Sequence, residues 1–239
     1  MEENLCLLWQ DVSTRSWYHV GNLIKHDDDS FSFYYELKEK DKGLEEALAV
    51  GYQLHPAFPL MEKEYHSTKL FSAFARRLPS RNRRDYGFLF DLQKNLTNFE
   101  LLELTGGSLY VDSYEFVKPV KENEGMFEIE CFLRAWRHWN DESEMLLETT
   151  KLSLEMEPNN EYDRNAVCVI NGETRKKIGY IPAFYSSFVT RVLKEEIPIH
   201  LEYHYFEEAA PQYKVKLILV GEIPQKLNYQ IKNDSLLLY

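Results

Sequence analysis

The stretch that decides the fold of the second half reads Glu157-Pro158-Asn159-Asn160-Glu161-Tyr162-Asp163-Arg164-Asn165-Ala166-Val167. It opens with a proline and two asparagines, which favour a turn because Pro fixes φ and Asn tolerates the left-handed conformation. It ends in an apolar run that is typical of a β-strand. Between the two lie an aromatic ring, a carboxylate, a guanidinium and an amide. The pattern predicts a turn that presents recognition side chains at the entrance to a strand.

Length and composition favour a globular protein with extensive β-sheet. The 239 residues allow one large or two small domains, and 44% of them are hydrophobic. Aromatic residues make up 14%, including 16 Tyr and 14 Phe, which favours sheets with half-buried faces. No apolar run is long enough to cross a bilayer, and the N-terminus has no signal-peptide pattern. We therefore expect a cytoplasmic protein with no membrane association.

The cysteines and histidines predict neither a metal site nor a cofactor. Cys6, Cys131 and Cys168 lie far apart in apolar runs, so we expect buried, reduced thiols. No CxxC pair occurs, and the histidines lack the spacing of zinc ligands.

The formal net charge of -11 restricts any contact with nucleic acid. Proteins that cover duplex DNA through many phosphate contacts are usually basic. Binding by this chain must therefore be local, and it must depend on stacking or on recognition of an end.

The first half predicts a small α+β module over residues 1–122. Alternating residues indicate strands over 5–9, 17–24 and 31–35, joined by polar turns. A helical period then runs from 67 to 94, and Leu78-Pro79-Ser80 divides it into two helices. A polar segment over 118–125, with one Pro and one Gly, predicts the domain boundary.

The break between the two predicted helices is the most basic part of the chain. The arginines around it are Arg76, Arg77, Arg81, Arg83 and Arg84. Two interpretations stay open, a solvated corner between helices or a site for an anion or a protein partner. For the partner site we select Arg76, Arg77, Arg83 and Arg84.

The second half, residues 123–239, predicts a small β-barrel with one helix. Strands are expected over 126–133, 152–156, 166–170, 177–181, 199–205 and 213–220. Asn171-Gly172 predicts a two-residue hairpin turn, and Pro182 opens a helix over Ala183–Leu193. About six strands and one helix suit a barrel of OB or SH3 size.

No motif of a known enzyme class is present. The chain has no Gly-rich phosphate loop, no nucleophile elbow and no kinase signature. His138 with Asp141 or Glu142, beside Cys131, is the set that most resembles a catalytic group, and a loop of solvated polar residues explains it more simply. We expect a binding protein and not an enzyme, although a constellation that assembles only in three dimensions is an alternative.

Two motifs in the second half together resemble the HIRAN domain, over about Phe127 to Val220. They are Glu157-Pro158-Asn159-Asn160 with Tyr162-Asp163-x-Asn165-Ala166-Val167, and Lys177-Ile178-Gly179-Tyr180-Ile181-Pro182. The resemblance implies an OB-like β-barrel. It also implies single-stranded DNA as the partner, because the HIRAN domains of eukaryotic fork-remodelling helicases bind its 3′-hydroxyl end.

The resemblance assigns the central roles to the turn. It implies that Tyr162 stacks on the terminal base and that Asp163 accepts a hydrogen bond from the 3′-hydroxyl, with Asn165 in the same turn. An aromatic ring can stack on any base, and a carboxylate accepts from a hydroxyl but repels a phosphate. The structural alternative is that Asp163 and Asn165 cap the turn while Tyr162 closes the barrel.

Four further residues are implied as DNA contacts. Tyr180 follows the glycine where DNA-binding members carry a ring, and Tyr213 aligns with an aromatic residue that contacts a base. The register of the first barrel strand is ambiguous, so Arg134 is our first choice for the basic contact and Arg137 the second.

The first half resembles, more weakly, the N-terminal region of HipA-type toxins. The residues that carry this are Val20-Gly21-x-Leu23, Phe31-Ser32-Phe33-x-Tyr35, Phe58-Pro59-Leu60, Tyr65-x-Ser67, and Phe74-x-x-Arg77-Leu78-Pro79 with Arg83 or Arg84. The kinase of those toxins is missing, so the resemblance implies only a protein-interaction module. We thus expect a non-catalytic bacterial or phage protein that binds single-stranded DNA ends. The alternative is a regulatory component of a toxin–antitoxin or phage-defence system with a structural barrel.

Overall fold

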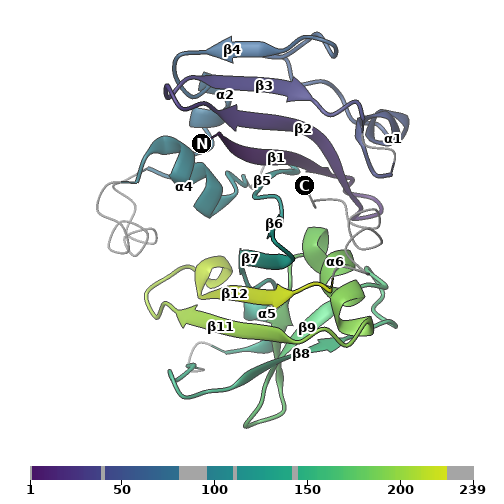
Figure 1. The fold of residues 1–239 in the computed structure, drawn as a ribbon, viewed down its shortest axis with the longest axis vertical. Helices are drawn as coiled ribbons and strands as arrows, with labels where there is room; N and C mark the ends of the chain where they lie inside the picture. Colours follow the sequence, from purple (N-terminus) through teal and green to yellow (C-terminus); the bar gives the residue numbers. More distant parts are fainter. Residues whose placement is uncertain (1, 39–40, 81–95, 110–111, 142–144, 225–239) are drawn as a thin grey trace. The chain divides into compact units, whose positions relative to one another are not determined.

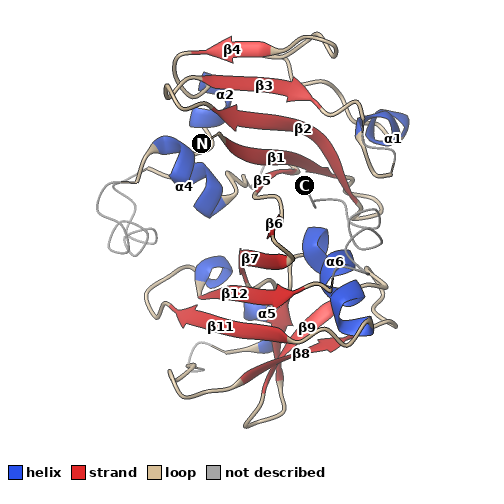
Figure 2. Ribbon diagram, viewed as in Figure 1, coloured by secondary structure: helices blue, strands red, loops and turns tan. Residues whose placement is uncertain are grey.

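The computed structural model describes residues 2–38, 41–80, 96–109, 112–141 and 145–224. These residues divide into two compact units, one that ends at Pro119 and one that begins at Val120. Strands predominate over helices in both units (Figure 2). The first unit is therefore richer in β-structure than the expected α+β module.

The first unit is built on a five-stranded antiparallel sheet (Figure 1). Its strands are β1 (Glu3–Gln10), β2 (Trp17–Lys25), β3 (Phe31–Tyr35), β4 (Tyr65–Ser67) and β5 (Tyr114–Val117). They lie in the order β4-β3-β2-β1-β5. The three strands predicted at the start of the chain are confirmed, although each contains a run of consecutive buried residues and does not alternate between buried and exposed positions.

The core of this unit is an aromatic cluster around Phe33, which is fully buried. The ring of Phe33 lies 4.4 Å from that of Phe58 and 5.2 Å from that of Phe74, measured between centroids. Phe74 in turn packs edge-on against Phe116 of β5 at 4.8 Å. Edge-to-face pairs at these distances add to the hydrophobic stabilisation of the rings. The cluster therefore joins β3, β5 and the segments between them.

Helices α1 (Leu44–Ala49), α2 (Ser72–Ala75) and α4 (Asn98–Thr105) accompany this sheet. The prediction of a long helix from residue 67 was wrong, because α2 has only four residues. The second predicted helix, from Ser80, falls largely outside the described residues. Helix α4 begins with a capping box, in which the Thr97 side chain accepts from the Glu100 N–H and Glu100 in turn accepts from the Thr97 N–H.

The structure gives Arg77 a structural role, which corrects its proposed place in a partner site. Arg77 is only 8% exposed, and its two Nη atoms donate to the carboxylate of Asp112 at 2.7 and 2.6 Å. Its Nε donates to the Gly107 carbonyl oxygen at 2.8 Å. A buried guanidinium satisfied in this way cannot contact a partner. Arg76 is exposed, whereas Arg81, Arg83 and Arg84 lie outside the described residues.

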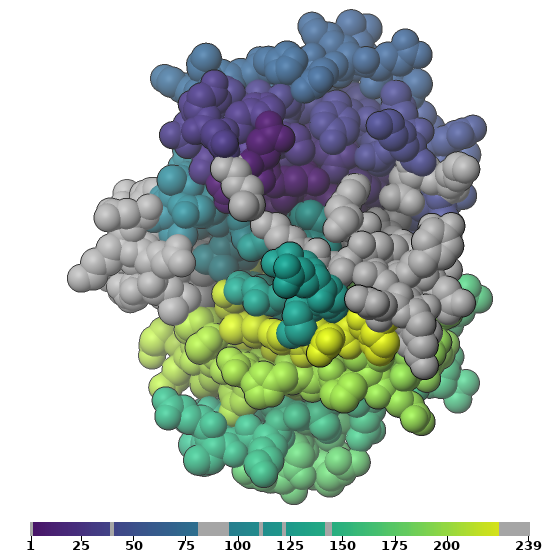
Figure 3. All heavy atoms as spheres, viewed as in Figure 1, coloured from purple at the N-terminus to yellow at the C-terminus, as the bar shows by residue number. Residues whose placement is uncertain are grey.

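The second unit contains two antiparallel sheets. The three-stranded sheet has the order β10-β9-β8, from β8 (Leu152–Met156), β9 (Val167–Asn171) and β10 (Lys177–Tyr180). The four-stranded sheet has the order β11-β12-β7-β6, from β6 (Lys121–Asn123), β7 (Met126–Phe132), β11 (Ile199–Tyr205) and β12 (Val215–Glu222). Figure 3 shows the atoms of β11 and β12, yellow-green to yellow, as a band across one face of this unit.

Three short elements complete the second unit: α5 (Trp136–Trp139), α6 (Ala183–Lys194) and a 3₁₀ turn (Pro211–Tyr213). The predicted helix after Pro182 is confirmed as α6. Phe188 on its buried face meets Phe127 of β7 edge-on at 5.0 Å. Helix α6 therefore contributes side chains to the core that β7 also lines.

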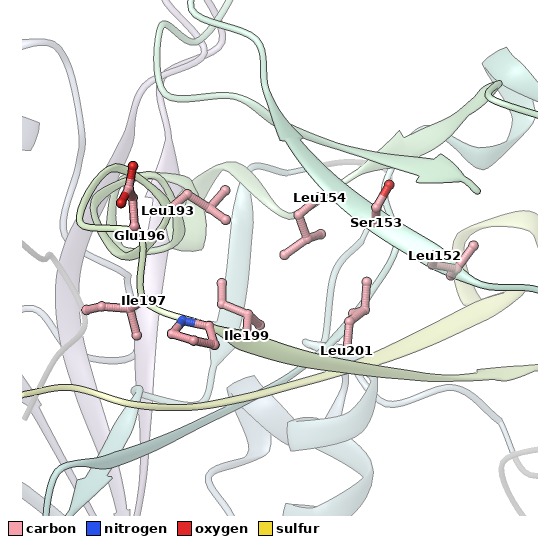
Figure 4. Close-up of a pocket in the computed structure, with 9 residues that line it drawn as sticks. Leu152, Ser153, Leu154, Leu193, Glu196, Ile197, Ile199 and Leu201 are labelled. Atoms are coloured by element: carbon pink, nitrogen blue, oxygen red, sulfur yellow. The ribbon is translucent and has the colours of Figure 1, made fainter.

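The expected closed barrel is not formed. On one side, the described residues join the two sheets through one bridge, between Arg134 and Tyr180. On the other side β8 and β11 are outer strands, and no ladder joins them in the described part of the chain. Their side chains, with Leu193 of α6, line a groove of about 380 Å³ (Figure 4). Leu152 and Leu154 of β8 and Leu201 of β11 are among the residues that line it.

The hairpin between β9 and β10 is longer than the predicted two-residue turn. Asn171 and Lys176 close the loop, since the Asn171 N–H donates to the Lys176 carbonyl oxygen at 2.9 Å. The Asn171 side-chain oxygen accepts from the N–H groups of Glu173 and Thr174, and Arg175 takes the left-handed φ of 58°. The asparagine thus forms an Asx turn, which competes with a tight hairpin.

Arg77→Ala should destabilise the first unit by about 3 kcal/mol, because it removes one partner of a buried ion pair and leaves the other unpaired. Urea denaturation, followed by NMR signals of β1 and β3, measures this loss. Arg76→Ala is the matched control, since an exposed arginine should change stability by less than about 0.5 kcal/mol. Equal effects of the two substitutions would contradict the structural role of Arg77.

Candidate functional site

The segment between β8 and β9 folds into a turn that Asn160 holds in place. The Asn160 side-chain oxygen accepts from the N–H groups of Tyr162 at 3.0 Å and of Asp163 at 3.2 Å. The Glu157 N–H donates to the Ala166 carbonyl oxygen at 2.8 Å, which closes the base of the turn. Asn and Asp fold the backbone locally in this way because their short side chains reach N–H groups two or three residues on.

Tyr162 and Asp163 lie at the tip of this turn. Tyr162 is 64% exposed, so its ring does not close the barrel. One oxygen of Asp163, Oδ1, accepts from the Asn165 N–H at 2.8 Å. Among the described residues, the other oxygen, Oδ2, accepts no hydrogen bond. Asp163 therefore caps the turn, as the structural alternative expected, and it also retains an unengaged acceptor.

Asn165 links the turn to helix α6. Its carbonyl oxygen accepts from Thr190 Oγ1 at 2.8 Å. Its side chain is half-buried. The end of the turn is therefore fixed to a packed helix while the tip stays accessible.

A polar network beneath the turn joins it to β10. Glu157 Oε1 accepts from Lys177 Nζ at 2.5 Å, and Oε2 accepts from the Tyr180 hydroxyl at 2.7 Å. Lys177 Nζ also donates to the Tyr180 hydroxyl at 2.7 Å. Asn160 Nδ2 donates to Glu157 Oε2 at 2.7 Å, so the same amide that shapes the turn also reaches this network.

The network fixes the charges of its members. Hydrogen bonds from Lys177, Asn160 and Tyr180 lower the pKa of Glu157 from 4.5 to about 2. Burial lowers the pKa of Lys177, but its hydrogen bonds to Glu157 and Tyr180 outweigh this and raise the pKa overall. Burial raises the pKa of Tyr180. At neutral pH the network therefore contains a carboxylate, an ammonium and a neutral phenol.

Two aromatic rings lie against the ammonium of Lys177. Its Nζ is 4.4 Å from the centroid of the Trp139 ring and 4.8 Å from that of the Tyr180 ring, distances typical of cation–π contacts. The two rings meet edge-on at 6.2 Å. Trp139 is 45% exposed. The neighbouring Asn140 anchors it, because Asn140 Nδ2 donates to the Ile178 carbonyl oxygen of β10 at 2.8 Å.

Gly179 allows the close approach that places these segments together. Arg134 and Tyr180 exchange two backbone hydrogen bonds of 2.9 and 3.0 Å across the bridge. A Cβ atom at position 179 would lie 2.4 Å from the Arg134 carbonyl oxygen, which no side chain can occupy. This close backbone contact explains why the Lys177–Pro182 motif carries a glycine at position 179.

The HIRAN family model matches residues 126–230. The prediction of a HIRAN domain in the second half is thereby confirmed. The crystal structure of the HIRAN domain of human HLTF is similar to this chain with a TM-score of 0.37 and 13% sequence identity. That similarity covers 45% of this chain and 84% of the other. No curated protein matches the chain. The resemblance of the first half to HipA-type toxins stays a prediction.

The structure brings most of the predicted HIRAN site residues to one connected region. Tyr162, Asp163 and Asn165 share the turn, and the turn reaches Tyr180 through Asn160. Arg134 joins Tyr180 through the backbone bridge, while its guanidinium lies 5.9 Å from the centroid of the Phe184 ring. Arg137 is exposed on α5.

Tyr213 does not belong to this region in the way that was predicted. It is only 8% exposed, and its ring packs edge-on against Phe132 at 5.0 Å. A ring with both faces in the core has no surface on which a base could stack. Tyr213 ends the 3₁₀ turn before β12 and fills the core beside Phe132. The sequence alone does not distinguish a tyrosine that packs in this way from one that binds a base.

The site residues predicted from the sequence did not include Glu157, Asn160, Lys177 or Trp139. Lys177 and Tyr180 are three residues apart, and in a regular strand such residues point to opposite faces. A bulge between Lys177 and Gly179 changes the register and lets both side chains meet Glu157. No periodicity in the sequence indicates a bulge. The glycine at 179 was the one available signal.

The described residues offer little other chemistry. The set that most resembled a catalytic group in the sequence contains Cys131 and His138. In the structure Cys131 is buried, whereas His138 is exposed. No group of three or more His, Cys, Asp or Glu side chains in the described ranges is placed to hold a metal ion. No helix within those ranges is long and apolar enough to span a bilayer.

Glu157→Gln should reduce the dependence of HIRAN-domain stability on acid. The folded-state pKa of Glu157 is about 2, below the ordinary 4.5. Its contribution to the free energy of unfolding is therefore fully present above about pH 5 and is lost as the pH falls towards 2. The wild type should lose stability more steeply than the variant between these values, measured by urea unfolding that is followed by NMR signals of β9.

Glu161→Gln is the matched control, because Glu161 is an exposed carboxylate in the same turn. Its stability should change with pH in parallel with the wild type. Parallel curves for Glu157→Gln and the wild type would instead show that the Lys177 ion pair does not form in solution.

Proposed function

We propose that the HIRAN domain binds single-stranded DNA at a free 3′-hydroxyl end and does so without catalysis. The observation that carries this proposal is the pairing of an exposed aromatic ring, Tyr162, with an unengaged carboxylate oxygen on the adjacent Asp163. The resemblance of the motifs to DNA-binding HIRAN domains gives the two residues their roles.

Tyr162 provides a stacking surface for the terminal base. Its ring is exposed while its backbone is fixed by the Asn160 side chain, so little conformational freedom is lost on binding. Stacking of a base on an aromatic residue contributes about 1–3 kcal/mol and does not depend on base identity. We therefore expect little sequence preference at the terminal position.

Asp163 selects the chemical state of the end. Its Oδ2 atom can accept a hydrogen bond from a 3′-hydroxyl, and a hydrogen bond to a charged acceptor is stronger than one between neutral groups. A 3′-phosphate would place two or more negative oxygens beside this carboxylate and would be repelled. Neither end should change the conformation of the turn, because the cap on the Asn165 N–H uses Oδ1 and leaves Oδ2 for the ligand.

Recognition of an end is compatible with the charge of -11, since it needs few phosphate contacts. Arg134 and Arg137 stay the candidates for these contacts. Arg137 is exposed on α5, and Arg134 lies beside Tyr180.

We assign no chemical step to this site. Glu157, the other carboxylate of the region, is held in an ion pair by Lys177, and its pKa of about 2 makes it a poor proton acceptor near neutral pH. To the unengaged oxygen of Asp163 we assign the role of a hydrogen-bond acceptor for the 3′-hydroxyl.

A role of the first unit in binding a protein partner is a separate proposal. Of the four arginines selected for it, Arg76 is the one that is both described and exposed. Cytoplasmic location and bacterial or phage origin stay predictions from the sequence.

Binding to a 5′-labelled oligonucleotide with a free 3′-hydroxyl should be tighter than to the same strand with a 3′-phosphate, measured by fluorescence anisotropy. Asp163→Asn should remove this preference, because it removes the charge that repels a phosphate, and the amide NH2 in the place of Oδ2 can donate to a hydroxyl or to a phosphate oxygen. Tyr162→Ala should weaken binding to both strands by about 5- to 150-fold, the loss of one stacked base. Glu161→Gln, the control, should preserve the preference. Equal binding of the two strands by the wild type would refute end recognition.

The affinity should depend only weakly on salt. One or two phosphate contacts to a single strand give a slope of about -0.7 to -1.4 for log K against log salt concentration. Arg134→Ala should reduce the slope by about 0.7 if this arginine makes a contact, as we propose. The same change in Arg137→Ala, with none in Arg134→Ala, would assign the contact to Arg137. A slope of several units would show that binding uses a broad basic surface instead.

A further inference from the structure

Trp139 lies outside the set of residues to which the proposed function assigns a role. We propose that it forms a second stacking platform, which receives a base on the 5′ side of the terminal nucleotide. This inference rests on the proposed function, because it extends the path of the same strand. The ligand is a nucleobase of single-stranded DNA, and no sequence preference follows from the contact.

The exposure and the support of Trp139 carry the inference. The Lys177 ammonium covers one face of the indole at 4.4 Å, and Tyr180 meets it edge-on. The ring is nevertheless 45% exposed, so its accessible surface lies away from Lys177. A large aromatic side chain that is held on one face and nearly half exposed offers a surface on which a base can stack.

Contacts of Lys177, Tyr180 and the neighbouring Asn140 hold Trp139 in place in the absence of a ligand. Asn140 Nδ2 donates to the carbonyl oxygens of Trp136 at 2.9 Å and Ile178 at 2.8 Å, which ties α5 to β10. Lys177 is held in turn by Glu157 Oε1 at 2.5 Å and by the Tyr180 hydroxyl at 2.7 Å. Ordering the platform in advance reduces the entropic cost of binding.

A continuous set of contacts connects Trp139 with the terminal site. Lys177 contacts Trp139 on one side and Glu157 on the other, and Glu157 accepts from Asn160 at 2.7 Å. The Asn160 amide then binds the backbone of Tyr162 and Asp163. If the 3′ end lies at Asp163, the strand must leave it in the 5′ direction, and Trp139 is the exposed aromatic ring on the adjoining rim.

The role of Lys177 follows from the same contacts. Its charge is already matched by Glu157, with which it forms a 2.5 Å ion pair. It therefore positions the indole and does not contribute a net charge for a phosphate. Affinity gained at Trp139 should in consequence be nearly independent of salt, unlike a contact made by an arginine.

An abasic scan on the full-length protein tests the inference. Oligothymidylates of eight nucleotides with a free 3′-hydroxyl carry one abasic residue, moved stepwise from the 3′ end. In the wild type, loss of the base that stacks on Trp139 should weaken binding by about 5- to 150-fold. In Trp139→Ala the intact strand should bind more weakly by a similar factor, and the abasic residue at that position should have no further effect. Such coupling identifies the pair directly.

Two variants make the result specific to stacking. Trp139→Phe keeps a ring and should retain most of the affinity and the abasic effect. Leu147→Ala removes another exposed apolar side chain of the same unit, which is 62% exposed, and should change neither. An unchanged abasic profile in Trp139→Ala would overturn the inference.

The outcome also separates this inference from the proposed function. One possible result is that the wild type prefers the free 3′ end and Tyr162→Ala weakens binding, but Trp139→Ala binds like the wild type. The second platform is then wrong, and end recognition stands. If the wild type binds the strand with a free 3′-hydroxyl and the strand with a 3′-phosphate equally, the proposed function is wrong and the inference falls with it.

Discussion

The ion pair between Glu157 and Lys177 is the contact on which the recognition surface depends. It joins the start of the β8–β9 turn to the start of β10, and the Tyr180 hydroxyl and the Asn160 amide complete its hydrogen bonds. Each acceptor of the carboxylate is used, which makes a half-buried charge stable where an unsatisfied one would be costly. The exposed residues Tyr162 and Trp139 lie on either side of this pair.

Several features of the fold could be predicted from the sequence because they depend on local pattern. The alternation in Trp17–Lys25 and Phe31–Tyr35 gave the strands of the first sheet, and Pro182 marked the start of α6. The Pro-Asn-Asn turn was also predictable, because its geometry comes from side chains that bond to their own backbone. The HIRAN motifs then located the region of the candidate site.

Other features depend on contacts between distant segments, and no local pattern encodes them. The sequence predicted Arg77 in a basic surface patch. In the structure it is buried and forms an ion pair with Asp112, 35 residues further along the chain. The buried position of Tyr213 is set by Phe132 on another strand. The meeting of Lys177 and Tyr180 needs a bulge, and the open seam between β8 and β11 needs knowledge of how two sheets pack.

The single backbone bridge between Arg134 and Tyr180 has a mechanical consequence. The surface around it takes Trp139 from the segment after the four-stranded sheet and Tyr162 from a turn of the three-stranded sheet. A strand of DNA that touches both rings would act as a cross-link between the two sheets, at the side where the described backbone joins them through the two hydrogen bonds between Arg134 and Tyr180. Binding would then stabilise the domain at the side where the two sheets already meet, and the groove between β8 and β11 would stay open.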